Sequence, residues 1–533
     1  MPTAYESDGF ENLPARYRRV PKAEILRPLL RGQCQHPFPA TPQIQSSLSG
    51  AAKDLKRYND ELYHPQALNE KQLVERNLPG YKAAPAAIFK LPEELLDHIF
   101  SFVCDENYIG GRTDTCIPAA TLGQVCSFWR TQVEFSPRLW STIVIEPHPI
   151  RDDRPTDPWR PLEHLLSQSG SHPLSVVIRL HPEHLSFHEW DFDPLECVRM
   201  LVCHCHRWLN VKLDINSGLN WALRPTLEPT RGHLPLLEHL VIDTVVTEKS
   251  DLIDVFQNAP KLRTVTLYIE SDPSLIVLPW NQLQSLTLWG AILYEPVFLC
   301  SQLKALTVEG FNKTIVPKED LADTELSETE AFSVALTTLS CLDFISKLTL
   351  PRLTSLSLSS YEKDKEVKLV SGVGVITSLL CRSSCTLTSL NWSCLQVEPG
   401  LFLSFLEGLP TLQTLSIGEH KCEIWDRLIS DGLFRKLHIQ LPSPSESVDT
   451  FLPYLQSLSL SVKWLSGFPA QLFVDTIKSR WLPEIDSRVE CLAAVRLEMP
   501  TCFLDDSQVD SLQDLADAGL KIVVTTKSSV IVC

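Results

Sequence analysis

The chain has 533 residues, with 48 basic and 65 acidic side chains and a formal net charge of −17. This acidic balance argues against nucleic acid as the main partner, because backbone binding needs a basic field that releases counterions. The sequence has no uninterrupted apolar run of the roughly 18 residues that a membrane helix needs, and its beginning lacks the apolar core of a signal peptide, so we expect no membrane association. The 16 cysteines are scattered, which favours reduced thiols and a cytoplasmic or nuclear location.

The first 84 residues divide into two predicted parts. Residues 1–45 are rich in proline and have no sustained period, which predicts a flexible leader. Basic side chains cluster around residues 16–31 and predict a disordered or adaptor-contacting tail in preference to a binding site. Residues 46–84 combine a helical segment, with apolar residues at intervals of three and four, and a linker that contains the Pro79-Gly80 turn.

Residues 85–145 contain three short amphipathic segments. The first is predicted to start with Pro92 at the first helical position and with glutamates in the first turn, where the helix dipole favours carboxylates. Its apolar residues form a wide stripe at the helical period: Leu91, Leu95, Leu96, Ile99, Phe100 and Val103. The second segment repeats this spacing with Leu122, Val125, Cys126, Trp129 and Val133. The third has Ser136 as its N-cap, followed by Pro137, Leu139 and Trp140.

Helices this short are marginal in isolation, so they must pack on one another or on a partner. One interpretation is a buried helical hairpin of a larger domain, because apolar stripes at helical spacing usually belong to a core. The order of residue types is more specific: a Leu-Pro start, an Ile-Phe pair, a Val-Cys-x-x-Trp segment and a Leu-Trp pair. That order favours a docking module.

The pattern resembles the F-box family. The matching residues are Leu91, Pro92, Leu95, Ile99, Phe100, Val125, Cys126, Trp129, Pro137, Leu139 and Trp140. The resemblance implies that these helices bind a Skp-type adaptor, which links the chain to a cullin scaffold and a ubiquitin-ligase subunit. Residues 104–118 depart from the family, whose members join the first two helices with a few residues. Such an insertion costs little loop-closure entropy, but it leaves the placement of the second helix open.

Residues 146–533 have a different pattern of apolar residues. A Leu-x-x-Leu-x-Leu motif recurs in this region. The first four copies begin at residues 237, 262, 283 and 303, which is the spacing of leucine-rich repeats. Each such repeat consists of a strand followed by a helix or an irregular return segment. The predicted fold class is therefore an α+β or α/β repeat: an N-terminal helical F-box followed by an irregular leucine-rich-repeat solenoid with terminal caps. Further strands are predicted at Leu174–Leu180, Trp208–Ile215, Ile345–Leu350, Leu492–Leu497 and Leu520–Val524. The acidic segment 318–330 is predicted to be an exposed loop or helix.

Alternation along each strand predicts which side chains face outward. Small hydroxyl residues dominate that face, as they do on many exposed strands. Tyr268, Trp289 and Glu309 should lie near one another if three consecutive repeats stack. Exposed aromatic residues are enriched at binding hot spots, so these three are the predicted contacts for a protein substrate.

The sequence offers little sign of catalysis or cofactor binding. The Cys-His-Cys-His run at 203–206 lacks paired zinc-ligand spacing, and His181, His184 and His188 lack a convincing fourth ligand. Phosphate-binding loops, dinucleotide fingerprints and nucleophile elbows are missing. We therefore predict a non-catalytic chain that needs no cofactor or metal.

Together these features predict a substrate-recognition subunit of a Skp–cullin–F-box ubiquitin ligase. Two alternatives stay open: a scaffold that uses the same helices without ubiquitin transfer, and a sensor that binds a small molecule within the array. A sensor would require a deep apolar pocket with converging polar groups.

Overall fold

The computed structural model describes residues 91–532, except for 111–114, 148–158, 181–192, 194, 216–219, 245–251, 270–274, 291–296, 310–322, 337–338, 361–366, 369–371, 420–426, 440–449, 464–466, 482–488, 501–503 and 527–529. The predicted leader, the helical segment 46–84 and His181, His184 and His188 lie outside the described residues. The chain forms two compact units, Met1–Asn210 and Val211–Cys533. None of the helices in the described ranges combines the length and apolarity needed to cross a bilayer.

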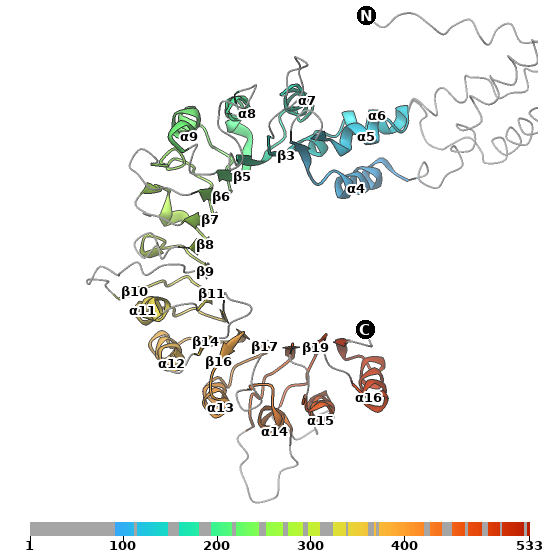
Figure 1. Cartoon of the computed structure of the whole chain (residues 1–533), viewed down its shortest axis with the longest axis vertical. Coiled ribbons are helices and arrows are strands. Elements are labelled where there is room, and N and C mark those ends of the chain that lie inside the picture. Colours follow the sequence, from blue (N-terminus) through green and yellow to red (C-terminus); the bar gives the residue numbers. More distant parts are fainter. Residues whose placement is uncertain are drawn as a thin grey trace, which may run out of the picture. The chain divides into compact units, whose positions relative to one another are not determined.

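The first unit mixes short helices with short strands. Its elements are α4 (Glu93–Val103), β1 (Asn107–Ile109), β2 (Thr115–Cys116), α5 (Pro118–Gly123), α6 (Ser127–Glu134), η3 (Pro137–Trp140), β3 (Thr142–Ile145), α7 (Arg160–Gln168), β4 (Leu174–Leu180), α8 (Glu196–Val202) and η5 (Cys205–Arg207). Figure 1 shows α4, α5 and α6 in blue and cyan. Strand β4 has the predicted bounds, and it pairs in parallel with β3. This unit therefore continues past residue 145, where the sequence suggested a boundary.

The second predicted helix is wrong in one respect, because the structure divides it into α5 and α6. Cys126 has an extended backbone (φ −158°, ψ 168°) and is the N-cap of α6, where its Sγ accepts a hydrogen bond from the Trp129 amide at 3.4 Å. A break of this kind leaves the three- and four-residue spacing of the apolar residues intact, so periodicity alone misses it. Pro92 is likewise the N-cap of α4 and not its first helical residue.

The insertion at 104–118 is structured where it is described. Strands β1 and β2 pair antiparallel, and β1 also pairs in parallel with β3. Asn107 is fully buried, and its Nδ2 donates to the carbonyl oxygens of Leu139 and Thr142, each at 3.0 Å. This side chain ties the insertion to η3 and β3, so the departure from a short helix connection is an integral part of the unit.

The second unit is built on parallel strands that pair in chain order: β6 (His239–Thr244), β7 (Thr264–Ile269), β8 (Ser285–Gly290), β9 (Ala305–Glu309), β11 (Ala331–Ala335), β13 (Ser355–Ser359), β15 (Ser389–Ser393), β17 (Thr414–Glu419), β18 (Ser457–Val462), β19 (Ala494–Met499) and β20 (Lys521–Thr526). Strand β21 (Val530–Val532) pairs antiparallel with β20. Strand β5 (Trp208–Ile215) has the predicted bounds and spans the boundary between the units.

Helices and short elements join successive strands of this unit. The helices are α9 (Asn220–Leu227), α11 (Leu339–Lys347), α12 (Gly372–Ser383), α13 (Pro399–Glu407), α14 (Asp431–Leu437), α15 (Ala470–Trp481) and α16 (Asp506–Asp517). The short elements are η7 (Glu228–Thr230), η10 (Trp280–Gln282), β10 (Thr324–Glu325), β12 (Leu348–Thr349), β14 (Val367–Lys368) and β16 (Leu395–Gln396). From α11 onward the helices lie on the side of the unit away from the long strands (Figure 1). The coarse prediction of a mixed α/β fold is confirmed, and its main element is a large, mostly parallel sheet.

The repeated leucines form the core of this unit. Every apolar residue of the predicted motifs, from Leu237 to Leu460, is at most 2% exposed. Because the strands are in register, the middle motif position forms a continuous ladder across the sheet: Leu240, Val265, Leu286, Leu306, Phe332, Leu356, Leu390, Leu415 and Leu458. Burial in this ladder stabilises each strand only through its neighbours.

The long gap between the motifs at 303 and 353 contains a strand that sequence reasoning missed. Strand β11 pairs with β9 on one side and β13 on the other. Its buried residues are Phe332, Val334 and Ala335, so it has no leucine to complete the motif. The predicted strand Ile345–Leu350 is wrong over most of its length, because Ile345 lies in α11 and only Leu348–Thr349 is extended. The acidic segment before β11 includes β10, and its Thr329 is fully buried and donates to the Leu303 carbonyl at 2.8 Å.

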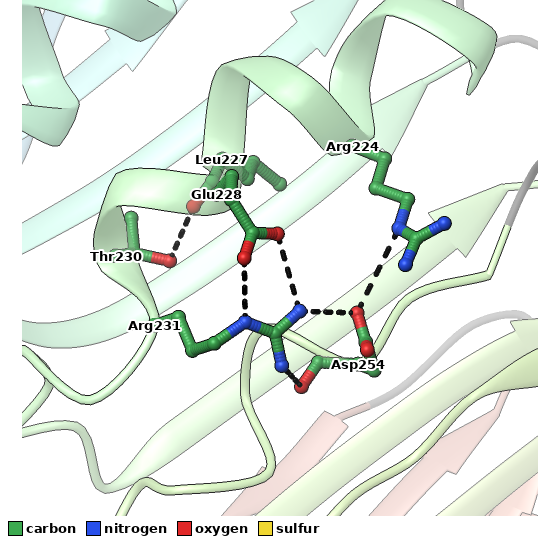
Figure 2. Close-up of polar contacts among 6 residues, drawn as sticks. All are labelled: Arg224, Leu227, Glu228, Thr230, Arg231 and Asp254. Carbon is green, nitrogen blue, oxygen red and sulfur yellow. Dashed lines mark hydrogen bonds and ion pairs between the residues drawn. The ribbon is translucent and has the colours of Figure 1, made fainter.

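Polar contacts connect the return segments outside the strands. The Arg231 guanidinium donates to both carboxylate oxygens of Glu228 at 2.6 and 3.1 Å and to Asp254 Oδ1 at 2.7 Å (Figure 2). Arg224 Nε lies 3.8 Å from the same Asp254 oxygen. These ion pairs raise the pKa of Arg231 and lower that of Glu228. The cluster links the α9–η7 return to the segment that leads into β7, although its partial exposure makes each pair weak.

A buried arginine provides a stronger link near the C-terminal end. Arg480 in α15 is 1% exposed, and it donates to the carbonyl oxygens of Leu437, Leu452 and Phe451 at 2.5, 3.0 and 2.5 Å. Burial lowers the pKa of Arg480 to about 10. One side chain thus donates to carbonyl groups of two separate segments and connects them through buried hydrogen bonds.

We expect Arg480→Met to lower the free energy of unfolding by about 3 kcal/mol, because it keeps an apolar stem but removes the buried hydrogen bonds from the guanidinium to three carbonyl groups. Urea unfolding of the full-length protein, followed by far-UV circular dichroism, measures the loss. Arg435→Met on the exposed face of α14 is the matched control and should leave the midpoint unchanged. Equal midpoints for the two variants would show that the carbonyl contacts contribute nothing.

Candidate functional site: two interaction surfaces

The first candidate surface is an exposed apolar face on the short helices of the first unit. Leu95, Ile99, Phe102 and Val103 follow one another at four, three and one residues along α4, and all four are exposed. We call these four residues the α4 apolar face. Val125, in the turn between α5 and α6, and Phe135, which follows α6, are exposed as well. Outside these helices only Leu299, Leu401 and Tyr454 are comparable among the described residues.

The opposite side of α4 belongs to the core of the unit. Leu96 and Phe100 are buried, and the Phe100 ring contacts the Trp129 ring edge to face with centroids 4.9 Å apart. Trp140 is buried too, and its Nε1 donates to the Val133 carbonyl at 2.8 Å. The apolar stripe of α4 is therefore too wide for its core. One half packs on α6 and η3, and the other half meets solvent.

The residues that resemble the F-box pattern thus divide into three groups. The exposed ones, available for contact, are Pro92, Leu95, Ile99, Val125 and Pro137. Leu91, Cys126 and Trp129 are half-buried. Phe100, Leu139 and Trp140 are buried and support the unit from inside. Direct contact with a partner is therefore limited to the first two groups.

Sequence reasoning missed Phe102 and Phe135 as candidate contacts. Phe102 is 72% exposed and Phe135 is 82% exposed, values that are unusual for phenylalanine in a folded unit. The spacing of Phe102 from Leu95 and Ile99, seven and three residues, was a usable signal. Phe135 follows the last residue of α6 and precedes the Ser136-Pro137 turn, so periodicity gave no indication of its exposure.

The second candidate surface lies on the outward face of β6 to β9. Asp243 pairs with Tyr268, Tyr268 with Trp289, and Trp289 with Glu309 in the strand register. The structure therefore brings the three predicted residues together. The rings of Tyr268 and Trp289 stack with centroids 5.3 Å apart and planes 24° apart. We call these four residues the aromatic–acidic row.

The electrostatics of the row are those of partly buried acids beside an aromatic pair. Burial raises the pKa of Tyr268, and the nearby carboxylates of Asp243, Glu309 and Asp214 raise it further. Burial also raises the pKa of Glu309. The raised pKa of Tyr268 keeps its hydroxyl group neutral, whereas the shift of Glu309 shows a carboxylate that is partly removed from water and gains more from a cation than a fully hydrated carboxylate does.

The outward face changes character farther along the sheet. Ser357, Asn391, Ser416 and Ser459 occupy one register position on successive strands. Asn391 Nδ2 donates to Ser357 Oγ at 2.9 Å. On β19 the carboxylate of Glu498 accepts from Arg496 on the same strand. This part of the face is small, neutral or internally paired, so the aromatic–acidic row stands apart from it.

The cysteine and histidine run at 203–206 does not form a ligand set. Burial raises the pKa of Cys205. Burial is also the main cause that lowers the pKa of His204, and the charges of Arg207 and His206 lower it further. In the described ranges, no three His, Cys, Asp or Glu side chains converge on a position that a metal ion would occupy.

The sequence matches no protein-family model, and comparison with curated proteins finds no significantly similar relative. A functional assignment therefore rests on the residues of this chain and on the two surfaces described above.

The division of α4 predicts opposite outcomes for adjacent residues. Phe100→Ala should destabilise the first unit by about 3–5 kcal/mol, because it opens a cavity beside Trp129. Ile99→Ala should change stability by less than about 1 kcal/mol, because Ile99 already meets solvent. Thermal unfolding of the full-length variants, with tryptophan fluorescence as the readout, compares the two. Equal losses would show that Ile99 also belongs to the core.

Proposed function

We propose that this chain is the substrate-recognition subunit of a Skp–cullin–F-box ubiquitin ligase. The observation that carries the proposal is the α4 apolar face, which lies within the segment that resembles an F-box. Isolated apolar residues on a surface need no explanation, but several on one short helix, with Phe102 among them, indicate a protein contact. The α4 apolar face is the expected docking surface for the Skp-type adaptor.

The second unit supports the proposal through its repeat. Each repeat contributes one parallel strand with buried leucines, and the connection to the next strand includes a helix, a short element or an irregular segment. This arrangement is typical of a leucine-rich-repeat solenoid, whose outward strand face is an extended binding surface. The antiparallel pairing of β21 with β20 is consistent with a terminal cap, because it ends the run of parallel strands.

In this proposal the chain brings the substrate close to the ubiquitin-loaded enzyme and does not itself make or break covalent bonds. The F-box helices hold the adaptor and, through it, the cullin and the ubiquitin-loaded enzyme. The outward strand face holds a protein substrate, and its lysines then meet the activated ubiquitin at a raised effective concentration. A scaffold that used the same helices would bind the adaptor equally well, so only ubiquitin transfer distinguishes the two functions.

We expect Ile99→Asp to abolish co-purification with a Skp-type adaptor, because it places a carboxylate in the centre of an apolar interface. The matched control is Leu401→Asp on α13, since Leu401 and Ile99 are each 40% exposed. The control should bind the adaptor like the natural chain, and circular dichroism should show both variants folded. Unchanged binding by folded Ile99→Asp would overturn the F-box assignment.

Ubiquitin transfer is a separate test. Proximity labelling in cells with and without a proteasome inhibitor should reveal partners that accumulate under inhibition and are lost with Ile99→Asp. Partners whose amounts do not respond to the inhibitor would support the scaffold function instead.

A further inference from the structure

We propose that the aromatic–acidic row binds an arginine side chain of a protein partner, with the guanidinium on the Tyr268–Trp289 pair and Glu309 as its counter-charge. The proposal refines the substrate-recognition role by naming the chemistry of the partner, and in that sense it rests on the proposed function. The structural evidence for the site comes from the geometry of β6 to β9.

The first argument is the position of the carboxylates relative to the rings. Adjacent strands are about 4.8 Å apart, so Asp243 and Glu309 flank the aromatic pair across about 14 Å. A cation over an aromatic face is attracted by the ring quadrupole within about 6 Å of the centroid. Carboxylates at both ends of the pair strengthen that attraction and disfavour an acidic or purely apolar ligand.

The second argument is the state of Glu309. Its carboxylate is half-buried, and among the described residues it has neither a hydrogen bond nor an ion pair. A partly desolvated charge without a partner is unfavourable in the free protein. A guanidinium placed beside it would restore the lost solvation, so the site gains more from a cation than from a neutral group.

The third argument distinguishes arginine from lysine. The guanidinium is planar, stacks on aromatic rings and is more weakly hydrated than an ammonium group, so it leaves water at lower cost. The register position two residues earlier on the same strands is occupied by Val241, Thr266, Thr287 and Thr307. These small side chains leave room for an arginine stem, and the three threonines supply hydroxyl groups for the partner's backbone. The net charge of −17 also favours the approach of a basic segment.

A display library of random linear peptides, selected on the full-length protein without an adaptor, tests the proposal. The natural chain should enrich arginine-containing sequences over lysine-containing ones. Trp289→Ala and Glu309→Gln should each weaken binding of an enriched peptide by about fivefold or more, measured by fluorescence anisotropy. Replacing the key arginine by citrulline, which keeps the shape and removes the charge, should have a similar effect.

Two matched controls separate the site from general attraction to an acidic protein. Glu498→Gln removes a carboxylate of the same outward face that is already paired with Arg496, and it should leave peptide binding unchanged. Trp289→Phe keeps an aromatic face and should retain more affinity than Trp289→Ala. Unchanged thermal unfolding of the variants would exclude loss of the fold as the cause.

Enrichment of acidic or apolar peptides, no enrichment of arginine, or equal effects of Glu309→Gln and Glu498→Gln would each overturn the proposal. Adaptor binding through Ile99 is measured independently, so failure here does not affect that result. Conversely, arginine binding by a chain that fails to bind the adaptor would leave this site intact and overturn the ligase assignment.

Discussion

The second unit depends on one constraint, the burial of apolar side chains between neighbouring parallel strands. Leu240, Val265 and Leu286 occupy the same register position on three consecutive strands, and the same relation continues through Leu458. No strand can bury these residues alone, so each repeat is stable only beside the next. Because inward and outward positions alternate, this burial also determines which side chains point outward. The alignment of Tyr268, Trp289 and Glu309 follows directly from the packing of the leucines that precede them.

The segment from α4 to η3 differs, because its apolar stripe is wider than its own core can bury. Phe100 and Trp140 fill the interior, whereas Ile99 and Phe102 remain in solvent on the same helix. A monomer gains nothing from exposing these residues, and water around them is unfavourable. The excess is explained if a partner covers it. The β1–β2 strand pair does not disturb this arrangement, because the Asn107 side chain donates hydrogen bonds to backbone carbonyls of η3 and β3.

The sequence predicted those features that depend on strict periodicity. Strands β4 and β5 have the expected bounds, and the outward positions of β6 to β9 are correct, because alternation of buried and exposed residues was regular there. The prediction failed where the period was interrupted or where residue types were atypical. Cys126 breaks a helix without changing the apolar spacing, and β11 uses Phe332 where the motif has leucine. The exposure of Phe135, which follows the last residue of α6, depends on how the helices pack in three dimensions, and periodicity does not report it.

The outward face of the second unit also indicates which residues should contribute most of the affinity for the proposed protein partner. From β13 to β18 its side chains are mainly serines and threonines, and these bring little apolar area to a contact. Some of them are already paired, as Asn391 and Ser357 show. Tyr268 and Trp289, in contrast, offer large rigid surfaces at low entropic cost and lie beside a carboxylate that lacks a partner. In the proposed arginine site, most of the binding energy should therefore come from a few residues of β7 to β9, while the remaining strands hold them in register.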